Sequence, residues 1–244
     1  MERSLITISL FLTFVIIGYM MPFRKIESSF KRRLIRWAKN ISFSLIYIIF
    51  SKLVLTHIYP DSTSFPAAPI VIMQLFILDL AIYLQHLLTH KVPVLWRLHR
   101  LHHSDTEFDT TTAFRFHPLE LLFSFIYKAL IMITFQIPGI VVVVYEVILN
   151  SCALFNHSNF EFPESIEKVL RKVIVTPGFH RIHHSSRQRE TNSNYSSTLS
   201  LWDYLFRTYV EHSKINPKKM DIGLKEFRSQ KEQRFLNLLK QPFT

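Results

Sequence analysis

Residues 98–103 read Leu-His-Arg-Leu-His-His, and residues 179–184 read Phe-His-Arg-Ile-His-His. A shorter motif, His-Leu-Leu-Thr-His, stands at residues 86–90. Because side chains three or four residues apart lie on one face of a helix, each motif is expected to present a row of imidazoles, as in an all-imidazole metal site. The motifs hold eight of the twelve histidines: His86, His90, His99, His102, His103, His180, His183 and His184.

Core or surface histidines would explain one such motif. Three motifs with helical spacing, each beside an apolar stretch, argue against that interpretation. His57 and His212 are different, since neither has a histidine partner at ligand spacing. We interpret these two as interfacial or surface residues.

Five apolar stretches approach the length of about 20 residues that a helix needs to cross a hydrocarbon core of about 30 Å. The last two are separated by Pro138 and Gly139 alone, which predicts an antiparallel helical hairpin with a short second arm. The stretches are 5–22, 41–57, 67–88, 119–137 and 140–155. The sequence therefore predicts an all-α fold of four to five membrane-spanning helices, with a cytosolic helical cap that carries a dimetal site.

The net charge is +11, which a nucleic-acid-binding protein could also show. However, seven basic residues crowd one loop between the first two apolar stretches, as in a cytoplasmic loop near anionic lipid. They are Arg24, Lys25, Lys31, Arg32, Arg33, Arg36 and Lys39. The loop at 56–69 contains Asp61 and no Lys or Arg, so it is placed outside. The amino terminus is then outside, the histidine motifs and all residues after 155 are inside, and no nucleic-acid partner is expected.

The first apolar stretch could be mistaken for a signal peptide. Its basic residues follow the apolar run, and no small-residue cleavage site is evident, so a retained helix is expected. The single cysteine, Cys152, lies inside an apolar run and cannot form an intrachain disulfide. Because the chain has one cysteine, a zinc site built from several cysteines is also excluded.

Three polar residues interrupt the predicted hairpin: Lys128, Glu146 and Asn150. A central lysine costs about 2.5–3.5 kcal/mol in a membrane helix, so these residues should face protein. Glu146, Asn150 and His157 follow one helical stripe toward the metal end. A structural ion pair between Lys128 and Glu146 and a functional lining of a substrate cavity both remain open.

The number of histidines is more informative than their type, because neutral imidazole suits zinc, copper, iron and nickel alike. Eight or nine candidate histidines are more than the three or four protein ligands that one zinc ion takes, so they imply two metal ions. Zinc peptidases carry H-E-x-x-H, and residues 86–90 lack that glutamate base. A metal-dependent lipid hydrolase is thus the weaker alternative. A membrane metal-binding or transport protein ranks last, since the histidines gather at one interface rather than along several spans.

Longer segments around the motifs resemble the fatty acid hydroxylase/sterol desaturase superfamily of membrane di-iron enzymes. The similar segments are 96–105, 110–120, 155–159, 177–185, 194–195 and 201–206, and the resemblance covers roughly 79–209. It implies a non-haem centre of two iron ions at the cytosolic membrane face. Such a centre activates O2 and abstracts hydrogen from a lipid C–H bond, with hydroxylation or desaturation as the outcome.

The resemblance also implies roles for individual residues. The eight motif histidines are the expected ligands, with His157 as a further one and Asn159 as a ligand acting directly or through water. His117 is expected to orient a ligand without binding metal. The substrate would be a lipid in the bilayer. The chain has four glycines and no flavin fingerprint, so electrons would come from an external donor: a cytochrome b5-like protein, a ferredoxin or a reductase.

Three regions are expected on this basis: N-terminal membrane helices with the basic loop at 1–66, a fatty acid hydroxylase-like catalytic domain at 67–212, and a basic cytoplasmic tail at 213–244. The chain departs from the family pattern at two positions. Ser196 and Arg207 stand where glycine is common. Because glycine supplies backbone freedom, the turns at these two positions are expected to differ.

Overall fold

The computed structural model describes residues 2–25, 27–58 and 65–244, with side chains described from residue 5 and not for 46–58. Asp61 and the side chain of His57 lie outside the described residues. The same is true of most of the loop at 56–69, which was placed outside the membrane because it lacks Lys and Arg.

Five helices carry the predicted spans: α1 (Glu2–Met20), α2 (Phe30–Ile58), α3 (Ala68–Lys91), α5 (Pro118–Thr134) and α6 (Gly139–Asn156). Shorter helices follow them: α4 (Pro93–His103), η1 (Thr110–Phe114), α7 (Glu164–Leu170), α8 (Pro177–His183), α9 (Gln188–Thr191), α10 (Leu201–Leu205), α11 (Phe235–Lys240) and η2 (Gln241–Phe243). Apart from two isolated bridges, the described residues form no β structure. The all-α prediction is confirmed for the described part of the chain.

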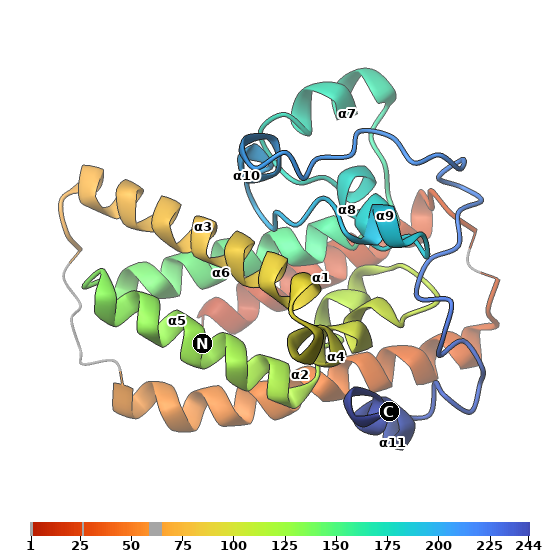
Figure 1. Cartoon of the computed structure of the whole chain (residues 1–244), viewed down its shortest axis with the longest axis horizontal. Helices are drawn as coiled ribbons and strands as arrows, with labels where there is room; N and C mark the ends of the chain where they lie inside the picture. Colours follow the sequence, from red (N-terminus) through yellow and green to blue (C-terminus); the bar gives the residue numbers. More distant parts are fainter. Residues whose placement is uncertain (1, 26, 59–64) are drawn as a thin grey trace.

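The long helices lie side by side, and α3 ends, α5 begins and α6 ends on the side of the bundle where α4 and α8 lie (Figure 1). α3 packs against both α5 and α6. The core between them contains Leu78, Val141, Val142 and Tyr145, all nearly inaccessible to solvent. α5 and α6 form the predicted antiparallel hairpin (Figure 1), and an ion pair of 3.0 Å between Lys128 Nζ and Glu146 Oε1 joins them.

Prolines set where the histidine helices begin. α4 and α8 each start with proline, whose fixed φ suits the first helical position and whose missing N–H is not needed there. The Thr176 side chain also accepts a hydrogen bond from the Phe179 N–H and so caps α8. Only Val92 separates α3 from α4, so the two helices meet at a sharp corner. That corner brings the first histidine motif against the second.

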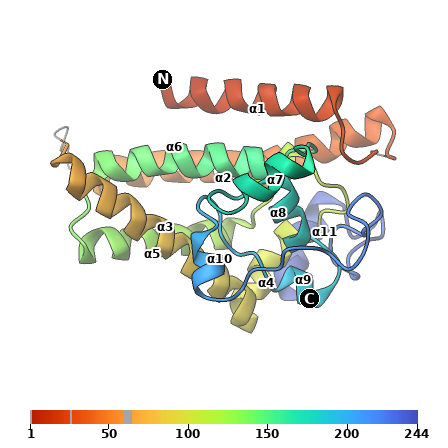
Figure 2. The ribbon, with the colours of Figure 1, turned by 90° about the horizontal axis from the view of Figure 1, so that it is seen from above.

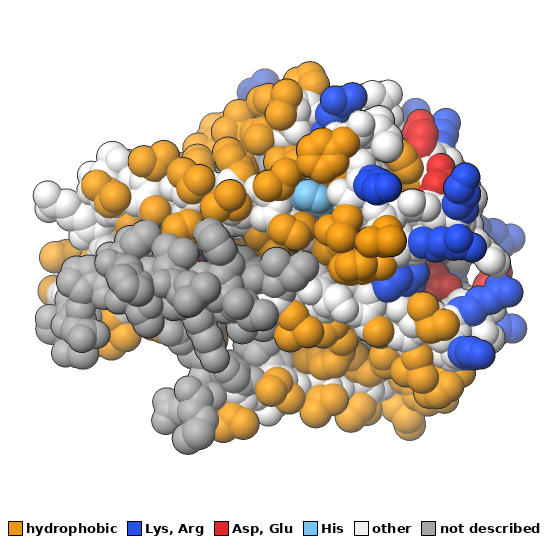
Figure 3. All heavy atoms as spheres, turned by 90° about the horizontal axis from the view of Figure 1, so that it is seen from below, with side chains coloured by type: hydrophobic (Ala, Val, Ile, Leu, Met, Phe, Trp, Pro, Cys, Tyr) orange, Lys and Arg blue, Asp and Glu red, His pale blue; other side chains and the backbone are white. Residues whose placement is uncertain are grey.

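Two described helices, α3 and α6, are long and apolar enough to cross a membrane by length and composition. α5 has 17 residues, and the apolar part of α1 is the shorter segment Leu5–Met20. The count of four to five spans therefore stays a prediction. Figure 3 shows hydrophobic side chains over much of one face, with charged side chains gathered at the right-hand end, where Figure 1 places the start of α2 and the tail.

The tail at 213–244 folds back on the histidine helices. Leu238 of α11 is buried against Phe43 of α2 and Leu101 of α4. Gly223 adopts φ +87, and a Cβ there would lie 2.5 Å from the Asp105 carbonyl oxygen. Its N–H donates to the His184 carbonyl. The predicted tail is thus packed into the same folded unit as the histidine motifs.

Candidate metal centre

All nine predicted ligand histidines come together in two groups, each with its candidate ligand atoms within 4.8 Å of one another. The first histidine group contains His86, His90, His99, His103 and His183. The second histidine group contains His102, His157, His180 and His184.

Each H-x-x-H-H motif contributes to both groups. In α4, His99 and His103 are four residues apart and face the first group, while His102 faces the second. In α8 the assignment is reversed, because His180 and His184 face the second group and His183 faces the first. Two helices with the same motif can therefore line two adjacent sites from opposite sides.

Backbone carbonyls fix the tautomer of three rings. His86 Nδ1 lies 2.6 Å from the Tyr195 oxygen, His183 Nδ1 lies 2.7 Å from the Ser193 oxygen, and His157 Nδ1 lies 2.7 Å from the Ala153 oxygen. A carbonyl can only accept, so each Nδ1 carries the proton and each Nε2 keeps its lone pair. Metal-binding histidines are commonly oriented in this way.

Ring nitrogens face one another at short distance inside both groups, and in the first group the facing Nε2 atoms of His86 and His99 both belong to rings whose Nδ1 carries the proton. His99 Nε2 and His86 Nε2 are 3.2 Å apart, although the Nδ1 of each ring is already bonded elsewhere. His157 Nε2 lies 3.1–3.2 Å from the Nε2 atoms of His102, His180 and His184. Two lone pairs at this distance repel unless a cation lies between them. Metal–imidazole bonds of about 2.0–2.1 Å place neighbouring ligand nitrogens about 3 Å apart, so the donor set fits metal ions.

Burial favours the neutral form of six of these histidines. It lowers the pKa of His157 to about 4 and that of His183 to about 3. Burial, followed by the neighbouring rings, also lowers the pKa of His102, His103, His180 and His184 well below the usual value. Neutral imidazole is the form that binds metal, so the site is in its binding state at neutral pH.

A buried carboxylate that the sequence reasoning missed supports the first group. Glu120 Oε1 accepts a hydrogen bond of 2.5 Å from His99 Nδ1, and both side chains are nearly inaccessible. Glu120 lies in the first turn of α5, at the end of the Arg-Phe-His-Pro-Leu-Glu segment. An acidic residue at the start of an otherwise apolar helix was the available signal.

His117 does not orient a ligand, contrary to the expectation. Its Nδ1 accepts the Leu119 N–H at 3.2 Å and caps α5, and its Nε2 lies 3.1 Å from the Leu239 carbonyl in the tail. Asn159 has both polar atoms of its side chain bonded to the backbone of Arg24. Its Oδ1 accepts the Arg24 N–H at 3.0 Å, and its Nδ2 donates to the Arg24 carbonyl at 2.7 Å. Asn159 thus fastens the chain after α1 rather than serving as a ligand.

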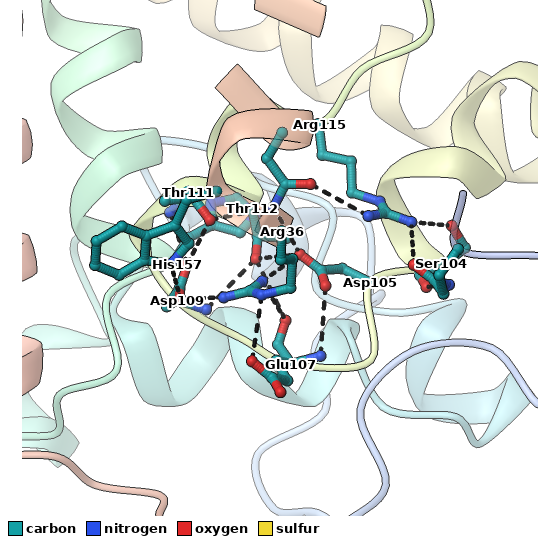
Figure 4. A network of polar contacts seen from close by, with 12 residues as sticks. Arg36, Ser104, Asp105, Glu107, Asp109, Thr111, Thr112, Arg115 and His157 are labelled. Atoms are coloured by element: carbon teal, nitrogen blue, oxygen red, sulfur yellow. Dashed lines mark hydrogen bonds and ion pairs between the residues drawn. The ribbon is translucent and has the colours of Figure 1, made fainter. Parts of the chain in front are cut away.

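A second buried polar cluster adjoins the histidines (Figure 4). Arg36 of α2 forms ion pairs with Asp105, Glu107 and Asp109, and Trp37 donates to Asp109 at 2.8 Å. Burial opposes ionisation of Asp105, but Arg36 and then Arg115 outweigh it and hold the pKa of Asp105 below its usual value. We call Arg36 and its three carboxylates the arginine cluster.

The basic loop is therefore only partly a lipid-facing surface. Arg24 donates to the carbonyls of Pro217 and Met220, and Lys39 donates to that of Gln233. With Arg36, these residues bind protein rather than anionic lipid. Lys25, Lys31 and Arg32 are exposed, as predicted for the loop.

The two positions that depart from the family pattern behave differently. Arg207 has φ 58, in the left-handed region that glycine favours. The turn thus keeps the backbone shape that glycine would give, and the expected difference is absent there. Ser196 does not adopt a positive φ. The residue with a positive φ in that turn is Asn194, two positions earlier, at φ 54.

The chain was compared with known proteins. A sequence model of the fatty acid hydroxylase family matches residues 71–208. Ornithine lipid hydroxylase OlsE of Rhizobium tropici is 31% identical over 189 residues, or 78% of this chain and 54% of that protein. Alkylglycerol monooxygenase of Homo sapiens is 29% identical, over 56% of this chain and 30% of that protein. Cholesterol 25-hydroxylase of Rattus norvegicus is 27% identical, over 59% of this chain and 48% of that protein.

The matched part spans about half the length of these relatives or less. No solved structure matches the chain.

Proposed function

This chain belongs to the fatty acid hydroxylase family, and we propose that it is a membrane-bound di-iron hydroxylase that uses O2 to oxidise a lipid C–H bond. The observation that carries the proposal is the pair of histidine groups, in which candidate ligand nitrogens converge within 4.8 Å and the Nε2 lone pairs of His86 and His99 face each other. That arrangement calls for two cations held by nitrogen ligands alone.

We assign the first histidine group to one iron ion and the second to the other. When bound, the two ions supply the activation of O2 and the abstraction of hydrogen from an unactivated C–H bond. The protein holds the ligands in place. Glu120 fixes the ring of His99, and the carbonyls of Tyr195, Ser193 and Ala153 fix three further rings.

Aromatic side chains keep the groups dry. Phe116 stacks on His102 with ring centroids 4.4 Å apart, and Phe108 lies 5.4 Å from His157. Trp96 contacts His90 at 4.9 Å. Exclusion of water protects an oxidising centre from side reactions.

Hydroxylation is proposed over desaturation because the three relatives described above are named hydroxylases or monooxygenases. The substrate would be a long-chain lipid whose tail lies among the helices while the reacting carbon reaches the centre from the membrane. We propose that the centre faces the cytoplasm. An external donor, a cytochrome b5-like protein, ferredoxin or reductase, would supply the electrons.

Two observations weigh against the alternatives. Hydrolysis needs a general base, and Glu120, the acid that contacts the first group through His99, is committed to that ring. Transport needs ionisable groups along the spans, and those of α3, α5 and α6 are engaged in protein contacts. Asp79 accepts from Tyr145 and Trp202, and Lys128 pairs with Glu146.

The test is the source of the oxygen atom in the product. Lipid extracts of cells with and without the gene identify the substrate as the species that gains one oxygen. Reconstituted protein is then supplied with that lipid, a reductant system and 18O2, with His183→Ala as the matched inactive control. Incorporation of 18O that depends on His183 is expected. Product oxygen derived from water, without consumption of O2, would establish a hydrolase instead.

A further inference from the structure

In the segment 193–206, which includes α10 (Leu201–Leu205), six polar side chains are buried beside the aromatic rings of Tyr195 and Trp202, and three large apolar side chains are exposed. Leu201, Leu205 and Phe206 are 45%, 61% and 46% exposed. The buried polar residues of the same segment are Ser193, Asn194, Ser196, Thr198, Ser200 and Asp203. This is the reverse of the pattern expected for a chain segment in water.

Several backbone groups of the segment have partners within the protein. The Asp203 carboxylate accepts the N–H groups of Tyr195 at 2.9 Å and Ser196 at 2.8 Å. The Thr198 carbonyl accepts the Val175 N–H, and the Ser197 carbonyl accepts Asn156 Nδ2. Irregular backbone at membrane depth is tolerated where protein partners satisfy it in this way.

α10 lies beside the middle of α3 rather than beyond its end, as both ribbon views show (Figures 1 and 2). Trp202 Nε1 donates to Asp79 at 2.7 Å, its ring meets Phe76, and Phe206 stacks on Tyr83 at 5.3 Å. α3 has 24 residues, or about 36 Å at about 1.5 Å per residue. Phe76 and Tyr83 each lie about 12 Å from an end of that helix. If α3 crosses the bilayer, α10 is at hydrocarbon depth.

The exposed apolar surface continues from α10 onto α7. The Ser200 N–H donates to the Val173 carbonyl at 3.2 Å, which places the start of α10 beside the chain after α7. Ile166, Val169 and Val173 are exposed there. Lys168 and Lys172 are also exposed and suit the phosphates at the edge of a bilayer. We call Ile166, Val169, Val173, Leu201, Leu205 and Phe206 the apolar face of the cap.

We propose that the apolar face of the cap is embedded in the cytoplasmic leaflet of the bilayer beside α3. The proposal rests on the proposed crossing of the membrane by α3, and it revises the expectation that all residues after 155 lie in the cytoplasm. The Tyr195 carbonyl holds His86, so the embedded segment directly adjoins the first histidine group. A lipid in that leaflet thus meets the protein next to the centre.

The proposal is tested by fluorescence quenching in vesicles of phosphatidylcholine and phosphatidylglycerol. Single cysteines replace Leu205, Met73 on the exposed side of α3, and Lys225 in the tail, each in a Cys152→Ala background and each labelled with an environment-sensitive dye. Lipids with a doxyl group on the acyl chain should quench the dyes at 205 and 73 alike, and aqueous iodide should quench the dye at 225.

Iodide quenching at 205 to the extent seen at 225, without doxyl quenching, overturns the proposal whatever Met73 shows. A second measurement uses the unaltered chain. Lipids with a diazirine on the acyl chain should label the peptide that contains Leu201 and Leu205 and leave the peptide around Lys225 unlabelled, and the reverse would contradict the proposal. Neither readout depends on metal or turnover, so the proposed oxidation can fail independently.

Discussion

Two buried polar clusters lie next to each other in this protein, and only one of them is complete by itself. In the arginine cluster, one guanidinium is surrounded by the three carboxylates it needs. In the histidine groups, buried ring nitrogens lie 3.1–3.2 Å apart, and between His86 and His99 both Nδ1 protons are already bonded elsewhere, so no proton lies between the two Nε2 atoms. The difference separates a cluster that stabilises the fold from a cluster arranged for something to bind.

The two clusters are joined through one stretch of chain. Asp105 lies two residues after His103, and Asp109 caps η1 through hydrogen bonds to the Thr111 and Thr112 backbone and side chains. Phe108, which contacts His157, lies between these acids. The arginine cluster therefore fixes the loop that covers the second histidine group.

Loss of a ligand should have the largest effect. His102→Ala removes one imidazole of the second histidine group, and turnover should be abolished because the iron ion loses a direct ligand. His212→Ala is the control, since that side chain is exposed and pairs only with Glu211. Iron content and 18O incorporation measure the effect. Equally mild losses at both positions would show that the groups are not a metal site.

Breaking the arginine cluster should destabilise the protein without removing a ligand. Arg36→Met leaves Asp105, Glu107 and Asp109 without their cation, and removal of one partner of a buried pair costs about 3–5 kcal/mol. Arg32→Met, one turn away on the exposed side of α2, should change stability by less than about 0.5 kcal/mol. The melting temperatures of the two variants in detergent measure this difference. Similar melting temperatures would mean that the cluster contributes little.

A smaller effect is expected at the contact that supports the first group. Glu120→Gln keeps an acceptor for His99 but removes the charge, and loss of such a partner typically lowers metal affinity or activity about 10–100-fold. His117→Ala should instead cost about 1 kcal/mol of stability, as for a lost helix cap, with metal affinity unchanged. Iron titration and thermal unfolding separate the two. A weaker metal affinity in His117→Ala than in Glu120→Gln would reverse the assignment.

The smallest effect is expected for a substitution at Arg207, which belongs to neither cluster. Arg207→Gly relieves the strain of a left-handed backbone at φ 58 in the folded protein. Because glycine's greater freedom in the unfolded chain offsets part of that relief, the net gain is expected to be about 1 kcal/mol or less. A slightly higher melting temperature is expected, with activity unchanged. A lower melting temperature would show that the Arg207 side chain contributes a contact that outweighs the strain.

The sequence predicted which histidines come together, because helical spacing determines which side chains share a face. His99, His103 and His183 could be recognised as candidates from spacing alone. Their division into two groups depends on how α3, α4 and α8 cross, which no local pattern encodes. The family resemblance suggested a ligand role for Asn159, and its contact with Arg24, 135 residues away in the sequence, could not be predicted from any local pattern.

The role of Glu120 and the packing of the tail at 213–244 were not predicted from the sequence, for a related reason. Glu120 acts on His99, 21 residues away, through a contact that depends on the angle between α4 and α5. Leu238 is buried against Phe43 and Leu101, but the short helix that carries it has too few apolar repeats to predict its packing. Hydrophobic periodicity shows that a face is buried and does not identify its partner.

The central claim is that the histidine groups hold two iron ions. Metal analysis and Mössbauer spectroscopy of detergent-purified, iron-supplemented protein test it most directly, because neither requires a known substrate. The account predicts two iron ions per chain, seen as a magnetically coupled ferric pair. Folded protein with one metal ion or none, or activity that depends on zinc and survives removal of iron, would contradict it.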